Sequence, residues 1–154
     1  MSNPYVKKEV TKILEDKKYE APLNLAMAAA WIIANFKGVN IKILDSSKTS
    51  SLCDYNILAT AENTIAARAM VDEFLSTLKE TDKEAISLEG MADGEWILLD
   101  LGEIIIHIFQ ENTRDVFDLD GLWSSLEHIQ IPQEFYFSSN DSNEPQPPSE
   151  QSYF

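Results

Sequence analysis

The chain has 154 residues, with 26 acidic and 12 basic side chains and a formal net charge of −14. A chain of this length is typical of one domain with a real hydrophobic core. Cys53 is the single cysteine, which excludes an intramolecular disulfide, and no apolar stretch is long enough to span a bilayer. We therefore expect a cytoplasmic protein without a signal peptide and without a membrane contact.

The acidic excess lies in the second half of the chain. Residues 1–83 contain eleven acidic and eleven basic residues, whereas residues 84–154 contain fifteen acidic residues and one basic residue, Arg114. Direct binding to nucleic acid depends on lysine and arginine side chains that neutralise phosphates, so nucleic acid is not expected as the main contact. Such a surface attracts a basic protein partner, although on composition alone solubility explains the charge equally well.

The first half of the chain predicts two helices followed by two strands. Residues 1–20 predict a polar helix with a thin apolar stripe, formed by Val6, Val10, Ile13 and Leu14. Pro22 fits the first turn of a second helix that runs to about Phe36. Strands are expected over residues 39–44 and 53–60, with a polar loop between them.

A long amphipathic helix follows, for which Asn63 is a good N-cap and which should end near Glu80. Its predicted apolar stripe has helical spacing and comprises Ala67, Met70, Val71, Phe74, Leu75 and Leu78. Residues 85–88 predict a short third strand, and residues 90–94 predict a loop with two glycines.

Two apolar runs, residues 96–99 and 104–109, have the length of strands and are joined by a turn that contains Gly102. A nearly unbroken apolar strand must be covered on both faces, which favours a layered domain. With the strands upstream, these two runs predict an α/β fold whose mixed sheet of about five strands is flanked by helices.

The C-terminal segment changes in composition. Residues 138–152 consist mainly of Ser, Asn, Gln, Pro and acidic residues, which predicts a disordered acidic tail. Alternatively, the apolar side chains just before it could dock back on the domain; these are Ile129, Ile131, Phe135, Tyr136 and Phe137. We divide the chain into a helical extension over residues 1–21, a central domain over residues 22–128 and a largely disordered extension over residues 129–154.

Candidate metal ligands are few. His107, His128 and Cys53 cannot complete a closed zinc site unless carboxylates join them. His107 lies in an apolar strand, where a histidine is more often hydrogen-bonded in or beside the core than a ligand. Cys53 has no histidine near it in sequence that would activate it as a nucleophile. We therefore expect no catalytic residue, no metal site and no cofactor.

Asp118 and Asp120 form an acidic pair of the kind that binds magnesium in nucleotidyltransfer enzymes. The neighbouring residues predict a helix, on which side chains two positions apart point in different directions and do not easily share a metal. The chain also has no glycine-rich phosphate loop. Arg114 is expected to pair with a nearby acid: Glu111, Asp115 or Asp118.

Trp96 begins a predicted strand directly after a loop, so partial burial is expected. It is either a core residue or an interface anchor, since tryptophans ringed by polar groups often dominate binding energy. The acids near it in sequence would supply such a rim; they are Glu89, Glu95, Asp100 and Glu103.

Several short motifs, taken together, follow the pattern of a known family. They are EG at residues 89–90, EWILLDLG at 95–102, IIHIF at 105–109, TR at 113–114 and DLDGLW at 118–123. Over roughly residues 23–124 the chain resembles the ribosomal silencing factors, which are also called the Iojap-related family.

The resemblance implies a nucleotidyltransferase-like fold and a function without catalysis. It implies binding to the large ribosomal subunit through its basic protein number fourteen, on the side that faces the small subunit. Binding there would block subunit association and repress translation when nutrients are scarce. The partner-binding residues then expected are Trp96, Leu99, Asp100, Leu101, Gly102 and Glu103. Whether the free protein is a homodimer is left open.

Two other functions are compatible with the sequence. One is a magnesium-dependent, nucleotidyltransferase-like enzyme that uses Asp118 and Asp120. The other is an acidic adaptor protein whose C-terminal tail binds a separate partner.

Overall fold

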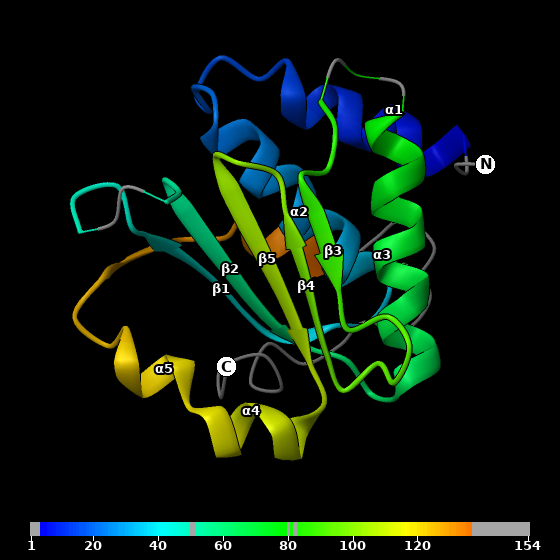
Figure 1. Cartoon of the computed structure of the whole chain (residues 1–154). Coiled ribbons are helices and arrows are strands. Elements are labelled where there is room, and N and C mark those ends of the chain that lie inside the picture. Colours follow the sequence, from blue (N-terminus) through cyan, green and yellow to red (C-terminus); the bar gives the residue numbers. More distant parts are fainter. Residues whose placement is uncertain (1–3, 50–51, 80, 82, 137–154) are drawn as a thin grey trace.

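The computed structural model describes residues 4–49, 52–79, 81 and 83–136, which form a mixed sheet with helices on both faces (Figure 1). In chain order the elements are α1 (Pro4–Leu14), α2 (Leu23–Asn35), β1 (Val39–Asp45), β2 (Tyr55–Thr60), α3 (Thr64–Leu78), β3 (Ser87–Glu89), β4 (Trp96–Asp100), β5 (Ile104–Phe109), α4 (Glu111–Phe117), α5 (Leu119–Leu122), β6 (Glu127–Ile129) and the 3-10 helix η1 (Gln133–Tyr136). The predicted α/β class is confirmed, with one strand more than the five expected.

The strands are arranged in the order β3-β4-β5-β2-β1-β6. β2 and β5 run parallel at the centre of the sheet, and the other neighbouring pairs are antiparallel. Both central strands are largely buried on their two faces, which explains why each reads as an almost continuous apolar run. The predicted hairpin forms between β4 and β5, and Gly102 in its turn adopts a φ of 88°.

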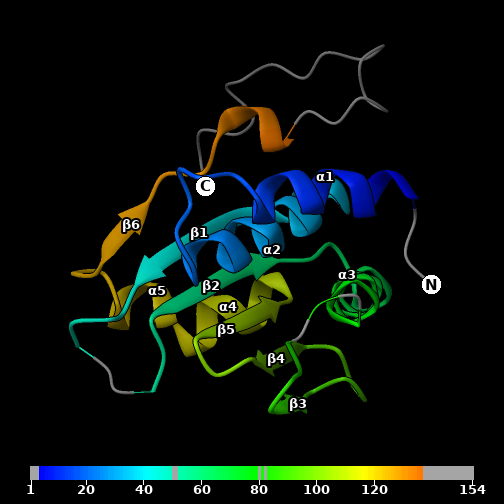
Figure 2. The same ribbon diagram turned by 90° about the horizontal axis from the view of Figure 1, so that it is seen from above.

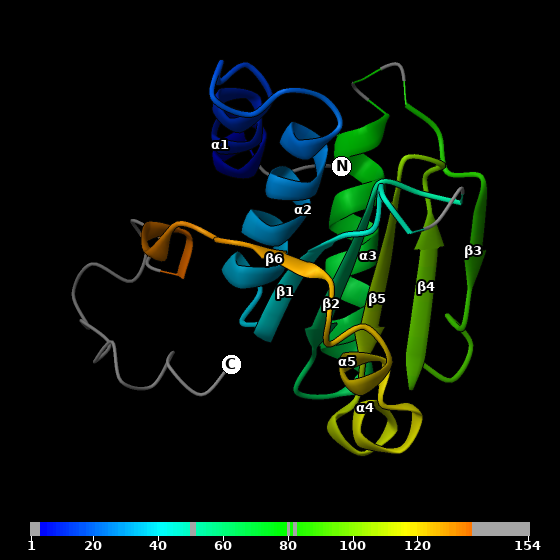
Figure 3. The same ribbon diagram turned by 90° about the vertical axis from the view of Figure 1, so that its left-hand side faces the viewer.

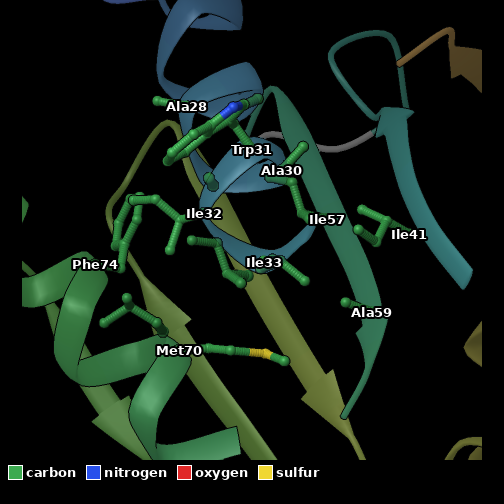
Figure 4. Packing of buried hydrophobic residues seen from close by; sticks show 14 of the residues in the cluster. Ala28, Ala30, Trp31, Ile32, Ile33, Ile41, Ile57, Ala59, Met70 and Phe74 are labelled. Carbon is green, nitrogen blue, oxygen red and sulfur yellow. The ribbon is translucent and has the colours of Figure 1, made fainter. Parts of the chain in front are cut away.

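The main core lies on the face of the sheet that α2 and α3 cover, which we call the helical face (Figure 2). α2 is buried nearly all round because α1 packs on its outer side and the sheet on its inner side. Asn63 caps α3 as predicted, since its side chain accepts a hydrogen bond of 2.8 Å from the backbone of Ala66. Figure 4 shows how side chains from α2, α3 and the strands fill this layer, among them Ile32, Ile33, Ile57, Ala59, Met70 and Phe74.

The predicted N-terminal helix is present, although it ends earlier than expected, at Leu14. Val6, Val10 and Ile13 are buried against α2, and the rings of Tyr5 and Trp31 lie 5.8 Å apart.

After α5 the chain folds back onto the domain, as in the alternative in which the apolar side chains before the tail dock on it. β6 pairs with β1 at the edge of the sheet, and η1 places Phe135 against α2 (Figure 3). Ile129, Ile131 and Tyr136 are partly buried against the same core. The predicted domain boundary after residue 128 therefore falls inside β6. The predicted disordered tail and Phe137 lie outside the described residues.

The opposite face of the sheet, which we call the second face, is covered at one end only. Leu44, Leu58 and Phe109 form a small second core there, beneath α4, α5 and the residues that follow them. In Figure 1 these two helices lie below the lower ends of the central strands.

Candidate functional site

Aromatic side chains gather where the second face meets α4 and α5. The ring of Trp96, at the start of β4, lies 5.0 Å from Phe109 and 4.8 Å from Phe117. The ring of His107 lies 6.0 Å from Trp96 and 5.8 Å from Trp123. We call these five residues the aromatic cluster. Its members come from two neighbouring strands and from the helical segment after them, so only the tertiary fold brings them together.

A directional chain of hydrogen bonds runs through the cluster. Trp96 Nε1 donates to His107 Nδ1 over 3.2 Å, and His107 Nε2 lies 3.1 Å from Asn56 Oδ1. Because an indole nitrogen can only donate, Nδ1 of the imidazole is the acceptor and Nε2 carries the hydrogen. Asn56 Nδ2 in turn donates to Ser46 Oγ over 2.8 Å and to Cys53 Sγ over 3.4 Å.

His107 is neutral at physiological pH because of its burial. Its side chain is 4% exposed, and desolvation lowers the pKa of the imidazole from 6.5 to about 4. The sequence prediction that this histidine is hydrogen-bonded in or beside the core is confirmed.

Acid should destabilise the fold through this histidine. The folded protein binds its proton less readily than the unfolded chain, so the stabilisation is complete above about pH 6.5 and is lost as the pH falls towards 4. The expected loss of unfolding free energy is about 3 kcal/mol. Urea unfolding of wild type and of His107→Phe across this range tests it: the variant should lack this part of the slope, and the exposed His128→Phe should retain it. Equal slopes for wild type and His107→Phe would contradict the prediction.

A concavity with a volume of about 510 Å³ adjoins the cluster on the second face. Asn56, Ile105 and His107 contribute to its lining from the sheet, and Leu52, Leu122 and Trp123 contribute from the segments beside it. Ser46, Thr49 and Ser125 also line it, so the concavity offers a partner both apolar surface and hydrogen-bonding groups.

The surface around the cluster is apolar with acidic residues at its border. Val116, Phe117 and Leu122 of α4 and α5 are 77%, 55% and 70% exposed. Phe117 contacts Trp96, and Leu122 lines the concavity, so both belong to this face. Exposed large apolar groups often mark an interaction site. The neighbouring exposed acids are Glu95, Glu111, Asp115 and Asp118.

Arg114 attaches α4 and α5 to the sheet. It is 4% exposed and makes two hydrogen bonds of 2.9 Å to the carboxylate of Asp120. Its remaining bonds reach the carbonyl of Asn40 at 2.7 Å and the hydroxyl of Thr60 at 2.9 Å. The predicted partners Glu111, Asp115 and Asp118 were wrong. Asp120 takes their place because the break between the two helices turns α5 back over Arg114.

Asp118 and Asp120 do not converge on a shared position. Asp118 has a left-handed backbone with a φ of 46°, and its side chain accepts a bond from Gly121 N at the start of α5. The Asp120 carboxylate binds Arg114 and, over 2.7 Å, Lys42. These cations hold the pKa of the Asp120 carboxyl well below its usual range, with the Arg114 hydrogen bond as the main cause. The arrangement is that of a structural ion pair.

The described residues contain neither a cluster of metal ligands nor a membrane-spanning helix. No three His, Cys, Asp or Glu side chains among them gather as the ligands of a metal ion would. None of their helices has both the length and the apolar character needed to cross a bilayer.

The structure separates the predicted partner-binding residues into two groups. Trp96 is half-buried in the aromatic cluster, whereas the turn formed by Asp100, Gly102 and Glu103 lies at the other end of the hairpin. Within the turn, Asp100 accepts a bond of 2.8 Å from Gly102 N, and Glu103 pairs with Lys83 over 3.0 Å. A role in binding stays a prediction for all six residues.

Leu99 and Leu101, the other two predicted binding residues, are 1% and 7% exposed and belong to the core of the helical face. Their side chains support the hairpin from inside. Sequence reasoning did not single out Asn56, Phe117 or Leu122 as site residues. The one available signal was Asn56, a polar residue inside an otherwise apolar strand.

The fold and this face define a small α/β domain with a mixed sheet, one face of which is left partly open beside an aromatic cluster. The family model described as "Ribosomal silencing factor during starvation" matches residues 19–153. The chain therefore belongs to the ribosomal silencing factor family.

Known proteins agree with this assignment. A ribosomal silencing factor from Chromobacterium violaceum is 33% identical over 91 residues, which cover 59% of this chain and 75% of that protein. A crystal structure of a protein from the same organism superposes with a TM-score of 0.60 at 28% identity, covering 82% of this chain and 89% of that one. A mouse protein named for mitochondrial assembly of the large ribosomal subunit is 26% identical over 74 residues, 46% of this chain and 32% of that protein.

Proposed function

We propose that this protein binds the large ribosomal subunit on the side that faces the small subunit, through the basic large-subunit protein numbered fourteen. The bound protein keeps the small subunit from joining and so represses translation when nutrients are scarce. The observation that carries the proposal is the aromatic cluster on the second face, in a chain that belongs to the silencing factor family.

The chemistry of this face suits a basic protein. The apolar side chains of Val116, Phe117 and Leu122 supply area that gains free energy when it is buried. The surrounding carboxylates attract lysine and arginine and speed the encounter electrostatically. The name of the mouse relative, which refers to the large ribosomal subunit, supports the choice of that subunit.

The proposed mechanism is steric competition and needs no catalysis. The fraction of large subunits that are blocked depends on the concentration of the protein relative to its dissociation constant. No bond is made or broken. The structural use of Asp120 as the partner of Arg114 and Lys42 agrees with a role other than metal binding.

Sedimentation through sucrose gradients with purified ribosomal subunits tests the proposal. We expect the protein to migrate with the large subunit and to reduce the formation of complete ribosomes when small subunits are added. Because the border of the site is acidic, binding should weaken as salt is raised. Protein that stays at the top of the gradient even at low salt would overturn the proposal.

A truncation separates this function from that of an adaptor. Removal of residues 137–154 keeps Phe135, which packs in the core, and retains every element that the structure describes. Under the proposal the truncated protein binds large subunits as the full chain does. An adaptor that uses its C-terminal tail would lose its partner.

A further inference from the structure

We propose that His107 and Asn56 are positioning residues for partner recognition, because they fix the indole of Trp96 so that it offers the partner a carbon surface and no hydrogen-bond donor. The effect on partner binding rests on the proposed function. The hydrogen bonds that hold Trp96 do not depend on it, because they lie within the fold.

The indole nitrogen of Trp96 is already used within the protein. It donates to His107 Nδ1, and His107 is held in this tautomer by the acceptor Oδ1 of Asn56. Asn56 Nδ2 donates in turn to Ser46 Oγ, while Oδ1 of the same amide faces the histidine. Because the indole can only donate, the direction of the hydrogen bonds is set from Trp96 on β4 through His107 on β5 to Asn56 on β2 and Ser46 at the end of β1.

The two positioning residues are too deeply buried to meet a partner themselves. The exposed fractions of His107 and Asn56 are 4% and 5%. Trp96 is half-buried and stands against Phe117, which is 55% exposed. A partner on this face therefore reaches ring carbons of Trp96 and Phe117, and its contact with the tryptophan is apolar.

Among the described residues, the neighbours of the imidazole are uncharged. By register, Leu98 of β4 and Leu58 of β2 flank His107 on the second face. The ring of Trp123 covers it from the segment after α5, and the thiol of Cys53 lies beyond Asn56. Two hydrogen bonds, one to Trp96 and one to Asn56, therefore set the orientation and the tautomer of the ring.

Nuclear magnetic resonance tests this arrangement without any ribosome. In the full chain labelled with nitrogen-15, we expect the Trp96 indole proton to exchange slowly with water and to shift in His107→Phe, while the indole signals of Trp31 and Trp123 serve as references. The His107 nitrogens should show a hydrogen on Nε2 and none on Nδ1 at neutral pH. A Trp96 indole proton that exchanges as fast as a solvent-exposed one, or a hydrogen on Nδ1, would overturn the inference.

The consequence for binding is tested with paired variants in the sucrose-gradient assay. Trp96→Phe keeps a ring but loses the nitrogen and the bond to His107, so we expect a loss of about five- to tenfold, against about a hundredfold for Trp96→Ala. If the partner took a hydrogen bond from the indole, the two variants would be equally weak, and the inference would be wrong.

A second pair of variants tests the positioning itself. His107→Phe and Asn56→Leu should each weaken binding about five- to tenfold at neutral pH, the effect of one lost hydrogen bond. Ile43→Val, a mild core change on the helical face, is the control and should bind as wild type. If both positioning variants bind as wild type while Trp96→Ala loses binding, the inference is refuted. If wild type itself does not bind, the proposed function fails, and the resonance measurement still decides whether the indole is fixed.

Discussion

Replacing Arg114 by alanine is expected to lower the free energy of unfolding by about 3–5 kcal/mol, the usual cost of removing one partner from a buried ion pair. The guanidinium is 4% exposed and satisfies Asp120, the carbonyl of Asn40 and the hydroxyl of Thr60 together. Without it, Asp120 keeps Lys42 as its single cation, and two acceptors at the end of the sheet lose their donor. Urea unfolding followed by circular dichroism measures the change.

Arg68 provides a matched control, because it is the other arginine of the chain. It donates to the carbonyls of Met91 and Ala92, both at 2.8 Å, and these carbonyls, not a carboxylate, are its partners among the described residues. Arg68→Ala should therefore cost about 1 kcal/mol, since water can replace it at the more exposed carbonyl. Similar losses for the two variants would show that the Arg114 network adds no more than ordinary hydrogen bonds.

The same ion pair predicts a loss of stability in acid. The pKa of Asp120 is depressed by Arg114, so the stabilisation is present above the carboxyl's ordinary pKa and is lost as the pH falls below it. This range lies below most of the range in which His107 acts, and the two variants Arg114→Ala and His107→Phe separate the two contributions.

Replacing Trp96 by alanine is expected to weaken binding to the large ribosomal subunit by about 30- to 1000-fold while the protein remains folded, as for a tryptophan at the centre of an interface. The side chain is half-buried, and its contacts with Phe109 and Phe117 lie on the second face, away from the main core. Its loss should therefore cost about 1–3 kcal/mol of stability, less than the removal of a fully buried tryptophan. Sedimentation measures the binding, and urea unfolding of the same samples measures the stability.

Ile65→Ala is the control for this variant. Ile65 is 75% exposed on α3, which packs on the helical face. The control removes exposed apolar area without touching the aromatic cluster and should bind as wild type. If Trp96→Ala is unfolded at room temperature, the main role of Trp96 is to stabilise the fold. Its contribution to recognition is then measured with Trp96→Phe.

Local sequence patterns were sufficient to predict most of the longer elements of this fold. The apolar stripe of α3, the cap at Asn63 and the two apolar runs of the β4–β5 hairpin are each written in consecutive or regularly spaced residues. β6 was not predicted, because three residues carry no periodicity and their pairing with β1 depends on where the chain returns. The break at Asp118 was not predicted either, although its hydrogen bonds to Arg114 and Gly121 are local.

The sequence by itself determined the family, the α/β class and the acidic second half, since motif spacing, periodicity and charge are properties of the chain. The tertiary structure decided which side chains meet. It paired Arg114 with Asp120 and buried the side chain of Leu99 in the core. It also joined Asn56, His107 and Trp96 in one hydrogen-bonded chain across three strands. The physical reason is that strand order and helix packing decide which residues are neighbours in the sheet and between layers. Both depend on burying the apolar surface of the whole chain at once.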